Sequence, residues 1–307
     1  MPEFLWYNCI KDGSAAIGLS ELRSVIMKRA DGTLLRHTDP MYRIAAHVMA
    51  KRSDSMNSIT LDIPLAPMDA YIRTKKKEGT PISHMAVLMA AYVRTVGEYP
   101  ALNRFIVNKR AYSRNEIAVG MVVLKGGEAD NGTMSKIYFQ PTDTIFDIEE
   151  RIQAYVSNNR AEGDNNATDK LITTLVSLPG LLRAAVCILK WADKHNLLPK
   201  AIIDASPFHT SMVFTNLASI RTNHIYHHCY DFGTTSVVMA AGNSREVAKR
   251  KGGEIVFEKC LPLGVVMDER IASGSYFAMA FRRMKQYLKD PSLLETAPAE
   301  VKPDPEL

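Results

Sequence analysis

A polar corner follows a short apolar run near the end of the chain. Leu263–Met267 is apolar and β-branched, which is typical of a buried strand, and Asp268–Arg270 follows it directly. Ser273 then precedes residues 274–289, whose apolar side chains recur at three- and four-residue steps, as in an amphipathic helix with a serine cap. A strand, a charged turn and a helix in this order present carboxylates and a guanidinium at the rim of a sheet. Such groups can bind a substrate or transfer a proton.

A second set of polar groups ends another apolar strand, residues 211–217. Thr215 and Asn216 follow the run Ser-Met-Val-Phe. A β-branched hydroxyl on a rigid strand is held in place before a reaction, so Thr215 could donate a hydrogen bond to an oxyanion. The structural alternative is a threonine that bonds across the sheet, and the sequence leaves both interpretations open.

Three of the eight histidines fall within five positions, at His224, His227 and His228. His224 and His228 are four residues apart, a spacing that suits a metal only on a helix, whereas the neighbouring residues are typical of a hairpin or loop. We therefore predict no metal site. His227 or His228 is a candidate base supplied from a loop.

The order of these elements resembles the catalytic domain of the dihydrolipoamide acyltransferases, which are relatives of chloramphenicol acetyltransferase. Their corner reads Asp-His-Arg-x-x-Asp-Gly, and residues 268–274 read Asp-Glu-Arg-Ile-Ala-Ser-Gly. The turn Tyr99–Asn103, and Thr215–Leu217 where the family has Ser-Asn-Leu-Gly, extend the resemblance over residues 41–295. The chain departs from the family at Glu269, in place of the catalytic histidine, and at Ser273, in place of the second aspartate.

The resemblance implies an α/β fold with a chloramphenicol acetyltransferase-like mixed β-sheet flanked by helices. It implies a homotrimer with active sites between subunits, acyl-coenzyme A as donor and a small-molecule acceptor. No lipoyl-like segment precedes residue 41, so we expect a free-standing protein. The catalytic candidates are Thr215 at the oxyanion and Glu269, His227 or His228 as base. The candidates for substrate binding are Asn216, Asp268, Arg270 and Ser273.

Glu269 has two interpretations. A thiol acceptor has a pKa of about 8.5, so an ordinary glutamate, at about 4.3, is a weaker base than an ordinary histidine, at about 6.5, by roughly 3 kcal/mol. Burial could raise the pKa of a glutamate and reduce this gap. Alternatively Glu269 pairs with Arg270 or with a neighbouring subunit and marks a lost active site. The second hypothesis is thus a catalytically inactive trimeric scaffold or ligand-binding protein.

Composition places the chain among ordinary globular proteins. It has 307 residues, 46% of them hydrophobic and 23% charged, with a net charge of +5. The Lys and Arg residues are dispersed and form no basic stripe among aromatics, which argues against nucleic-acid binding. The four cysteines have no paired spacing, and the N-terminus does not resemble a signal peptide, so we expect free buried thiols in a cytoplasmic protein.

The pattern along the chain predicts an N-terminal arm over residues 1–40, an acyltransferase-like domain over 41–295 and a flexible tail over 296–307. The apolar residues 171–191 are interrupted by Pro179-Gly180 and by charges, so no transmembrane span is expected. We interpret them as helices that pack in the core or at a subunit interface, or as a surface that touches a membrane or an acyl chain. Strands are predicted at 57–65, 104–108, 115–124, 135–140, 211–217, 235–242, 255–258 and 260–267, and helices at 41–51, 67–77, 84–99, 145–159 and 274–289.

Overall fold

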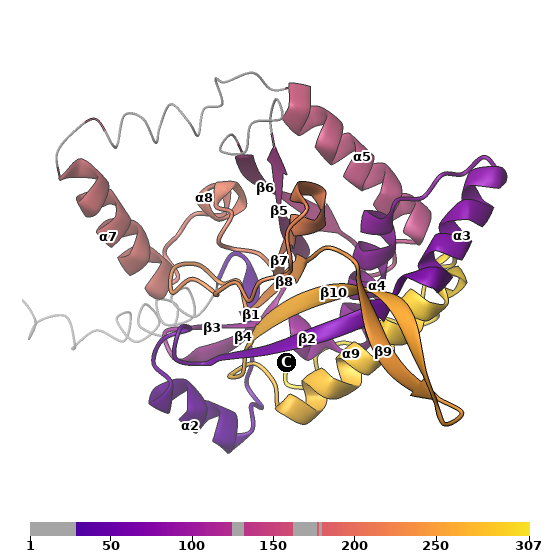
Figure 1. Cartoon of the computed structure of the whole chain (residues 1–307). Coiled ribbons are helices and arrows are strands. Elements are labelled where there is room, and N and C mark those ends of the chain that lie inside the picture. Colours follow the sequence, from indigo (N-terminus) through magenta and orange to yellow (C-terminus); the bar gives the residue numbers. More distant parts are fainter. Residues whose placement is uncertain (1–28, 125–131, 162–176, 178–179) are drawn as a thin grey trace, which may run out of the picture.

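The computed structural model describes residues 29–124, 132–161, 177 and 180–307. Its main sheet has the strand order β2-β10-β8-β7-β5-β6, and β9 pairs with part of β10 (Figure 1). β7 is parallel to both β5 and β8, and the other pairings are antiparallel, so the sheet is mixed. The strands are β2 (Met56–Pro64), β5 (Ile117–Leu124), β6 (Gly132–Phe139), β7 (Met212–Asn216), β8 (Val237–Ala241), β9 (Arg245–Lys251) and β10 (Glu254–Asp268).

A smaller antiparallel sheet and the helices complete the fold. The small sheet has the order β1-β4-β3, with β1 at Gly32–Leu34, β3 at Arg104–Val107 and β4 at Arg110–Arg114. The helices are α2 (Pro40–Val48), α3 (Leu65–Lys77), α4 (His84–Glu98), α5 (Ile145–Ala161), α7 (Leu181–Lys194), α8 (Lys200–Ala205) and α9 (Gly274–Lys289). The α/β architecture with a mixed sheet and flanking helices is the one predicted from the sequence.

The two faces of the main sheet have different environments because strand side chains alternate. On the inner face, side chains such as Phe214, Met239 and Val265 join one large core with α4, α5 and α9. On the outer face, Val213, Val238 and Val266 form a separate small cluster with Cys229. Thr215, two residues after Val213, and Gly264, two residues before Val266, share this outer face.

An irregular segment, residues 221–232, crosses the outer face. Its approach to the sheet depends on glycine, because a Cβ atom added to Gly264 would overlap the carbonyl oxygen of Ile225. A Cβ atom on Gly242 would likewise overlap the backbone nitrogen of His224. The absence of these two side chains lets the segment lie directly on β8 and β10.

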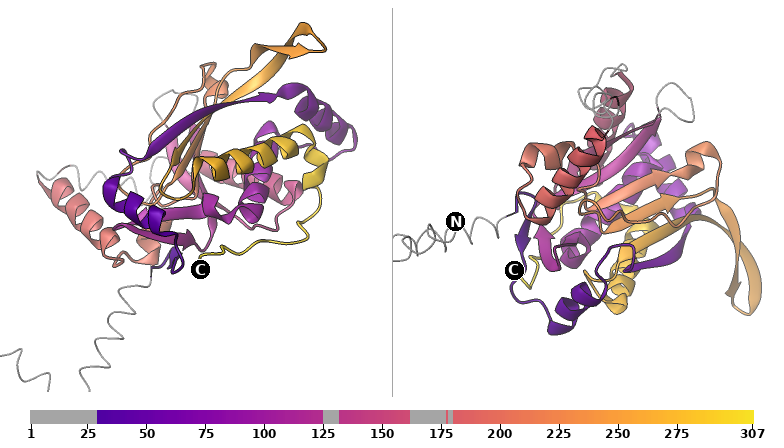
Figure 2. Two further views of the ribbon diagram at one scale, coloured as in Figure 1. Left: turned by 90° about the horizontal axis from the view of Figure 1, so that it is seen from below. Right: turned by 90° about the vertical axis from the view of Figure 1, so that its left-hand side faces the viewer.

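Several sequence predictions differ from the structure in detail. The two predicted strands at 255–258 and 260–267 are one strand, β10, whose first half projects with β9 as a hairpin beyond the body of the sheet (Figure 2). The turn of this hairpin is Gly252-Gly253, where both residues have positive φ angles. The strands β4 and β9 and the helix α8 were not predicted, since their sequences are too polar or too short for a clear period. Part of the predicted apolar segment 171–191 lies outside the described residues.

The C-terminal residues return to the body of the domain. Asp304 is buried and accepts two hydrogen bonds from Arg104, the one from Nε at 2.6 Å. The backbone nitrogen of Lys302 donates to the carbonyl oxygen of Gly97, and that of Arg36 donates to Glu306. These contacts hold the tail between α4 and the small sheet.

Cys229 and Cys260 are free and buried, as predicted, whereas Cys187 is exposed and Cys9 lies outside the described residues. None of the described helices has the length and hydropathy needed to cross a membrane.

Candidate functional site on the outer face and corner

Asp268 is the centre of a buried ion cluster at the end of β10. Its carboxylate is fully buried and accepts hydrogen bonds from Arg270 Nε at 2.8 Å, Arg270 Nη2 at 2.7 Å and Ser55 Oγ at 2.9 Å. Arg52 Nε lies 3.5 Å from the same carboxylate. Asp268 and Arg270 bind each other and neighbouring backbone groups. Their side chains therefore hold the corner in place.

Glu269 has a different environment from its neighbours. It is half-buried, and its Oε2 accepts a hydrogen bond of 2.6 Å from Asn57 Nδ2. The ion pair with Arg270 considered above is not formed, because Arg270 binds Asp268 instead. Among the described residues no cation pairs with Glu269, so its carboxylate remains available at the rim.

Ser273 caps the helix that follows the corner, as predicted from its position. Its Oγ accepts a hydrogen bond of 3.1 Å from the backbone nitrogen of Tyr276, and it lies 2.8 Å from Ser275 Oγ. The hydroxyl therefore stabilises the first turn of α9.

Thr215 lies on the outer face near the end of β7, where its side chain is half-buried, and Asn216 beside it is exposed. No hydrogen bond joins the Thr215 hydroxyl to any other described residue, so the alternative of a cross-sheet bond is not observed. A rigid strand thus presents a hydroxyl that is free to donate to a ligand.

Thr215 and the corner are far apart in one chain. Thr215 is opposite Ala240, and Ala240 is opposite Gly264. Asp268 is four residues beyond Gly264, about 13 Å along the strand, and β10 lies two strand spacings, about 10 Å, from β7. The separation of about 16 Å means that Glu269 and Thr215 can act on one small molecule only if they come from different copies of the chain.

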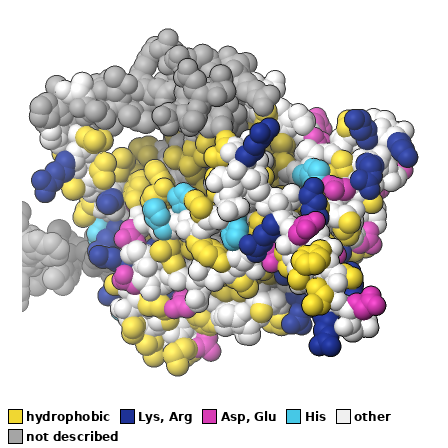
Figure 3. All heavy atoms as spheres, viewed as in Figure 1, with side chains coloured by type: hydrophobic (Ala, Val, Ile, Leu, Met, Phe, Trp, Pro, Cys, Tyr) yellow, Lys and Arg dark blue, Asp and Glu magenta, His cyan; other side chains and the backbone are white. Residues whose placement is uncertain are grey.

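His227 and His228 lie in the irregular segment, so the predicted loop is confirmed. The ring of His227 accepts a hydrogen bond from the backbone nitrogen of His228 at 3.0 Å, and both rings contact Tyr230. His228 is exposed and His227 is half-buried. Figure 3 shows several histidine side chains among hydrophobic ones on one face of the molecule.

The structure adds His224, which sequence reasoning considered only as a metal ligand. A Cβ atom on Gly264 would lie 3.0 Å from His224 Cδ2, so the ring lies over β10 at the level of Thr215. His224 Nε2 is 3.0 Å from Thr60 Oγ1, and that hydroxyl also bonds the Tyr226 hydroxyl. Thr60 is opposite Gly264 on β2, so Nε2 points away from β7, and two to three strand spacings, about 10–14 Å, separate the imidazole from the backbone of Thr215.

No group of three or more potential metal-ligating side chains occurs in the part of the chain that the structure describes. The helical spacing that would bring His224 and His228 together is also absent, because residues 221–232 are irregular.

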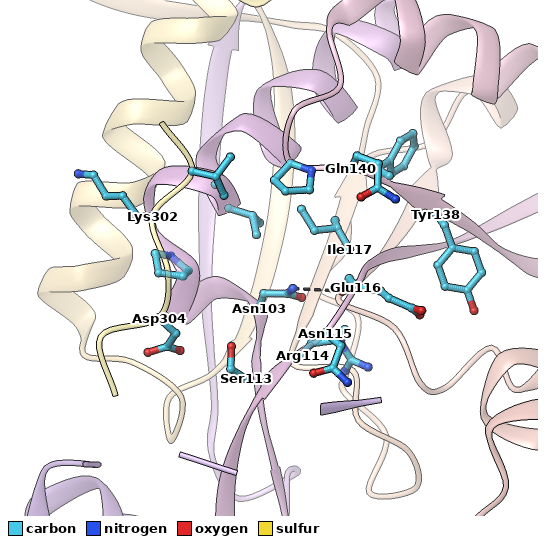
Figure 4. A pocket seen from close by; sticks show the side chains of 16 residues that line it. Asn103, Ser113, Arg114, Asn115, Glu116, Ile117, Tyr138, Gln140, Lys302 and Asp304 are labelled. Atoms are coloured by element: carbon cyan, nitrogen blue, oxygen red, sulfur yellow. Dashed lines mark hydrogen bonds between the residues drawn. The ribbon is translucent and has the colours of Figure 1, made fainter. Parts of the chain in front are cut away.

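The described cavities lie away from Thr215. One, of about 320 Å³, is bounded by the C-terminal tail and the ends of β4 and β6 (Figure 4). Asn103 points into it, with Nδ2 donating to the carbonyl oxygen of Glu116 at 3.1 Å. Arg114 also lines it, but this side chain is bound to Thr234. These residues hold the small sheet against the large one, and none is a predicted catalytic group.

Comparison with known proteins supports the architecture. No protein-family model matches the sequence, and no curated protein matches it. Among solved structures, the model is similar to a dihydrolipoamide acetyltransferase of Azotobacter vinelandii, studied for the roles of a serine, a histidine and an asparagine in catalysis. The TM-score is 0.55 at 10% identity, over 91% of this chain and 89% of that one.

Two further structures agree. A probable dihydrolipoamide acetyltransferase of Listeria monocytogenes gives a TM-score of 0.53 at 12% identity, over 82% of this chain and 92% of that one. A chloramphenicol acetyltransferase gives 0.51 at 10% identity, over 84% and 100%. The chain therefore has a chloramphenicol acetyltransferase-like fold, as the resemblance implied.

Proposed function

We propose that this protein is a coenzyme A-dependent acyltransferase whose active site lies on the outer face of the main sheet. The observation that supports this most is the unbonded hydroxyl of Thr215, held on a strand at the same level as the imidazole of His224. An oxyanion forms when an acceptor attacks a thioester, and one preorganised hydroxyl donor stabilises it.

His224 is the base that the proposal favours. An ordinary imidazole matches a thiol or hydroxyl acceptor at neutral pH better than an ordinary carboxylate does. Its bond to Thr60 on β2 fixes the ring orientation, and a thioester with its acceptor would have to span the strand spacings between this ring and Thr215. His227 and His228 are the loop alternatives, since both lie in the same segment.

Acyl-coenzyme A is the proposed donor because acyltransferases that share the fold use it. The outer face suits its thioester end, because Val122 and Ile225 are exposed apolar side chains on this face or on the segment that crosses it. Asn216, exposed beside Thr215, would contact the acyl acceptor or the donor.

Assembly as a homotrimer would bring Glu269 of one copy to Thr215 of the next. One of the solved structures of this fold is the cubic core of a pyruvate dehydrogenase multienzyme complex, so related folds form oligomers. In this chain α7 exposes Leu182, Ile188 and Trp191, the last two by 65% and 58%. Another copy that covered these side chains would bury them favourably.

The activity is tested by incubating the protein with acetyl-coenzyme A and either dihydrolipoamide or chloramphenicol, and measuring free coenzyme A by chromatography. His224→Ala should lower kcat by 10²–10⁴-fold, the usual contribution of a general base. His227→Ala, His228→Ala and Glu269→Gln are the comparison variants. If His224→Ala is as active as the wild type while Glu269→Gln is not, the base comes from the corner.

Mixing variants tests whether the corner acts between subunits. Trimers assembled at random from equal amounts of Thr215→Val and Glu269→Gln chains would contain both native groups at about a quarter of their interfaces. If Glu269 acts across the interface, the mixture should recover about a quarter of the wild-type rate. A mixture of Thr215→Val and His224→Ala should recover none, since these groups act within one chain.

A binding protein without catalysis is the second candidate. It is favoured by the corner itself, where Glu269 replaces the imidazole that the resembled family has there and Ser273 only caps a helix. Absence of turnover with both acceptors, together with saturable binding of acetyl-coenzyme A, would establish this alternative over the enzyme.

A further inference from the structure

A strongly basic cavity adjoins the corner at Arg270. It has a volume of about 410 Å³ and is bounded by the loop before β2, the turn between β3 and β4, the last turns of α7, and residues 231–233. Six cationic side chains and two carboxylates line it. The cationic side chains are Lys51, Arg52, Lys109, Lys190, Lys194 and Arg270.

The two carboxylates in the cavity are committed to other partners. Asp231 Oδ1 accepts hydrogen bonds from the backbone nitrogens of Arg52 and Ser53, at 2.9 and 3.1 Å. Asp193 is buried and accepts a hydrogen bond of 2.6 Å from Arg29. Burial alone would raise the pKa of Asp193, but the adjacent His209 ring and the charge of Arg29 outweigh it and lower the pKa to about 2.

The four lysines, in contrast, have no partner among the described residues. Lys51, Lys109, Lys190 and Lys194 are all exposed, and none forms an ion pair or a side-chain hydrogen bond within the described ranges. Four ammonium groups line one cavity without a carboxylate partner, and a bound anion would supply the opposite charge. The cavity therefore favours a ligand with several negative charges.

The turn that carries Lys109 supports the same conclusion. Asn108 and Lys109 both have positive φ angles, 48° and 63°, as in the tight turn of a two-residue hairpin. Glycine is preferred at the second position of such a turn, and a lysine there is strained. Lysine occupies this position despite the strain, and its ammonium group lies at the edge of the cavity.

The walls of the cavity are fixed by Arg52. Its Nη1 donates to the carbonyl oxygens of Tyr230 and Gly233, at 2.7 and 3.0 Å, and its Nη2 donates to that of Ile106 at 3.1 Å. One buried guanidinium thus joins the loop before β2, the small sheet and residues 230–233. The site needs no large rearrangement of these segments before it can bind.

We infer that this cavity binds an organic phosphate through Lys51, Lys109, Lys190 and Lys194. Ammonium groups are common phosphate ligands, and charge-assisted bonds to phosphate oxygens are among the strong hydrogen bonds. Ile106, Val107 and Phe232 supply an apolar wall, which suits a ligand with an organic part beside its phosphates. The inference does not depend on the proposed acyltransferase activity.

Isothermal titration calorimetry with ADP, coenzyme A, inorganic pyrophosphate and adenosine tests the site. ADP or coenzyme A should bind more tightly than pyrophosphate, and adenosine should not bind. The double variant Lys190→Ala/Lys194→Ala should weaken phosphate binding at least tenfold, and Lys190→Arg/Lys194→Arg should retain it. Both positions are exposed on a helix, where alanine is well tolerated, and an unchanged melting temperature would confirm the fold.

Matched controls identify the source of the phosphate and the position of the site. Lys76→Ala/Lys77→Ala removes two exposed lysines of α3 and should leave binding unchanged. If Lys190→Ala/Lys194→Ala loses only coenzyme A binding, the cavity binds the phosphates of the acyl donor. If it loses only ADP binding, the ligand is an organic phosphate other than the donor. Equal binding by the wild type and the Lys190→Ala/Lys194→Ala variant, or no binding of any phosphate at 1 mM in low salt, would overturn the inference.

Discussion

The two carboxylates of the corner should respond very differently to loss of charge. Asp268 accepts three side-chain hydrogen bonds in a fully buried site, whereas Glu269 accepts one from Asn57 at the rim. Asp268→Asn would leave Arg52 and Arg270 buried close together without their counter-charge. Breaking a buried ion pair from one side typically costs 3–5 kcal/mol, so the free energy of unfolding should fall by about 4 kcal/mol.

Urea denaturation followed by circular dichroism measures this difference. With a denaturant slope of about 3 kcal/mol per M, the midpoint for Asp268→Asn should fall by more than 1 M. Glu269→Gln is the matched control, because glutamine can still accept from Asn57 and the group is half-buried, and its change should stay within about 0.5 kcal/mol. A midpoint for Asp268→Asn within 0.3 M of the wild type would refute the assignment of a buried ion cluster. An equal loss of free energy of unfolding in Glu269→Gln would show that the Glu269 carboxylate also stabilises the fold.

Three further outcomes follow from the structure. The pKa of Asp193 is lowered to about 2. Its carboxylate should therefore contribute about 2 kcal/mol to the free energy of unfolding above about pH 4, and this contribution should be lost as the pH falls to about 2. Acid titration of the wild type and of Asp193→Asn measures the difference. Gly264→Ala should destabilise the protein by about 1–3 kcal/mol in urea, because the new Cβ overlaps Ile225, whereas Gly274→Ala, with open space around it, should not. Burial lowers the pKa of Lys136 to about 8, so the stability of the wild type should rise relative to Lys136→Met between about pH 8 and pH 10, and a constant difference would contradict this.

Most of the helices and strands could be predicted from local patterns in the sequence. Alternating apolar residues located β2 and β5, and the three- and four-residue periodicity with its serine cap located α9, since both signals arise from burial of one face. Short apolar runs located β7 and β8, which are buried strands. The corner was predicted as strand, turn and helix for the same reason. β9 was missed because its side chains alternate without an apolar face.

The roles within the corner could not be read from neighbouring residues. Asp268 and Glu269 are adjacent in sequence, yet their partners, Ser55 and Asn57, come from more than 200 residues earlier. His224 was considered only for metal binding because nothing in the sequence shows that it lies on Gly264. The basic cavity was also invisible, since its lysines come from three separate segments.

The hydroxyl of Thr215 is the group on which the proposed acyl transfer most depends. The most direct measurement is the rate of coenzyme A release from acetyl-coenzyme A by the wild type, Thr215→Ser and Thr215→Val. Removal of one oxyanion donor should lower kcat by 10²–10³-fold in Thr215→Val, while Thr215→Ser, which keeps the hydroxyl, should stay within about tenfold of the wild type. Equal rates for Thr215→Val and the wild type would contradict the proposed site.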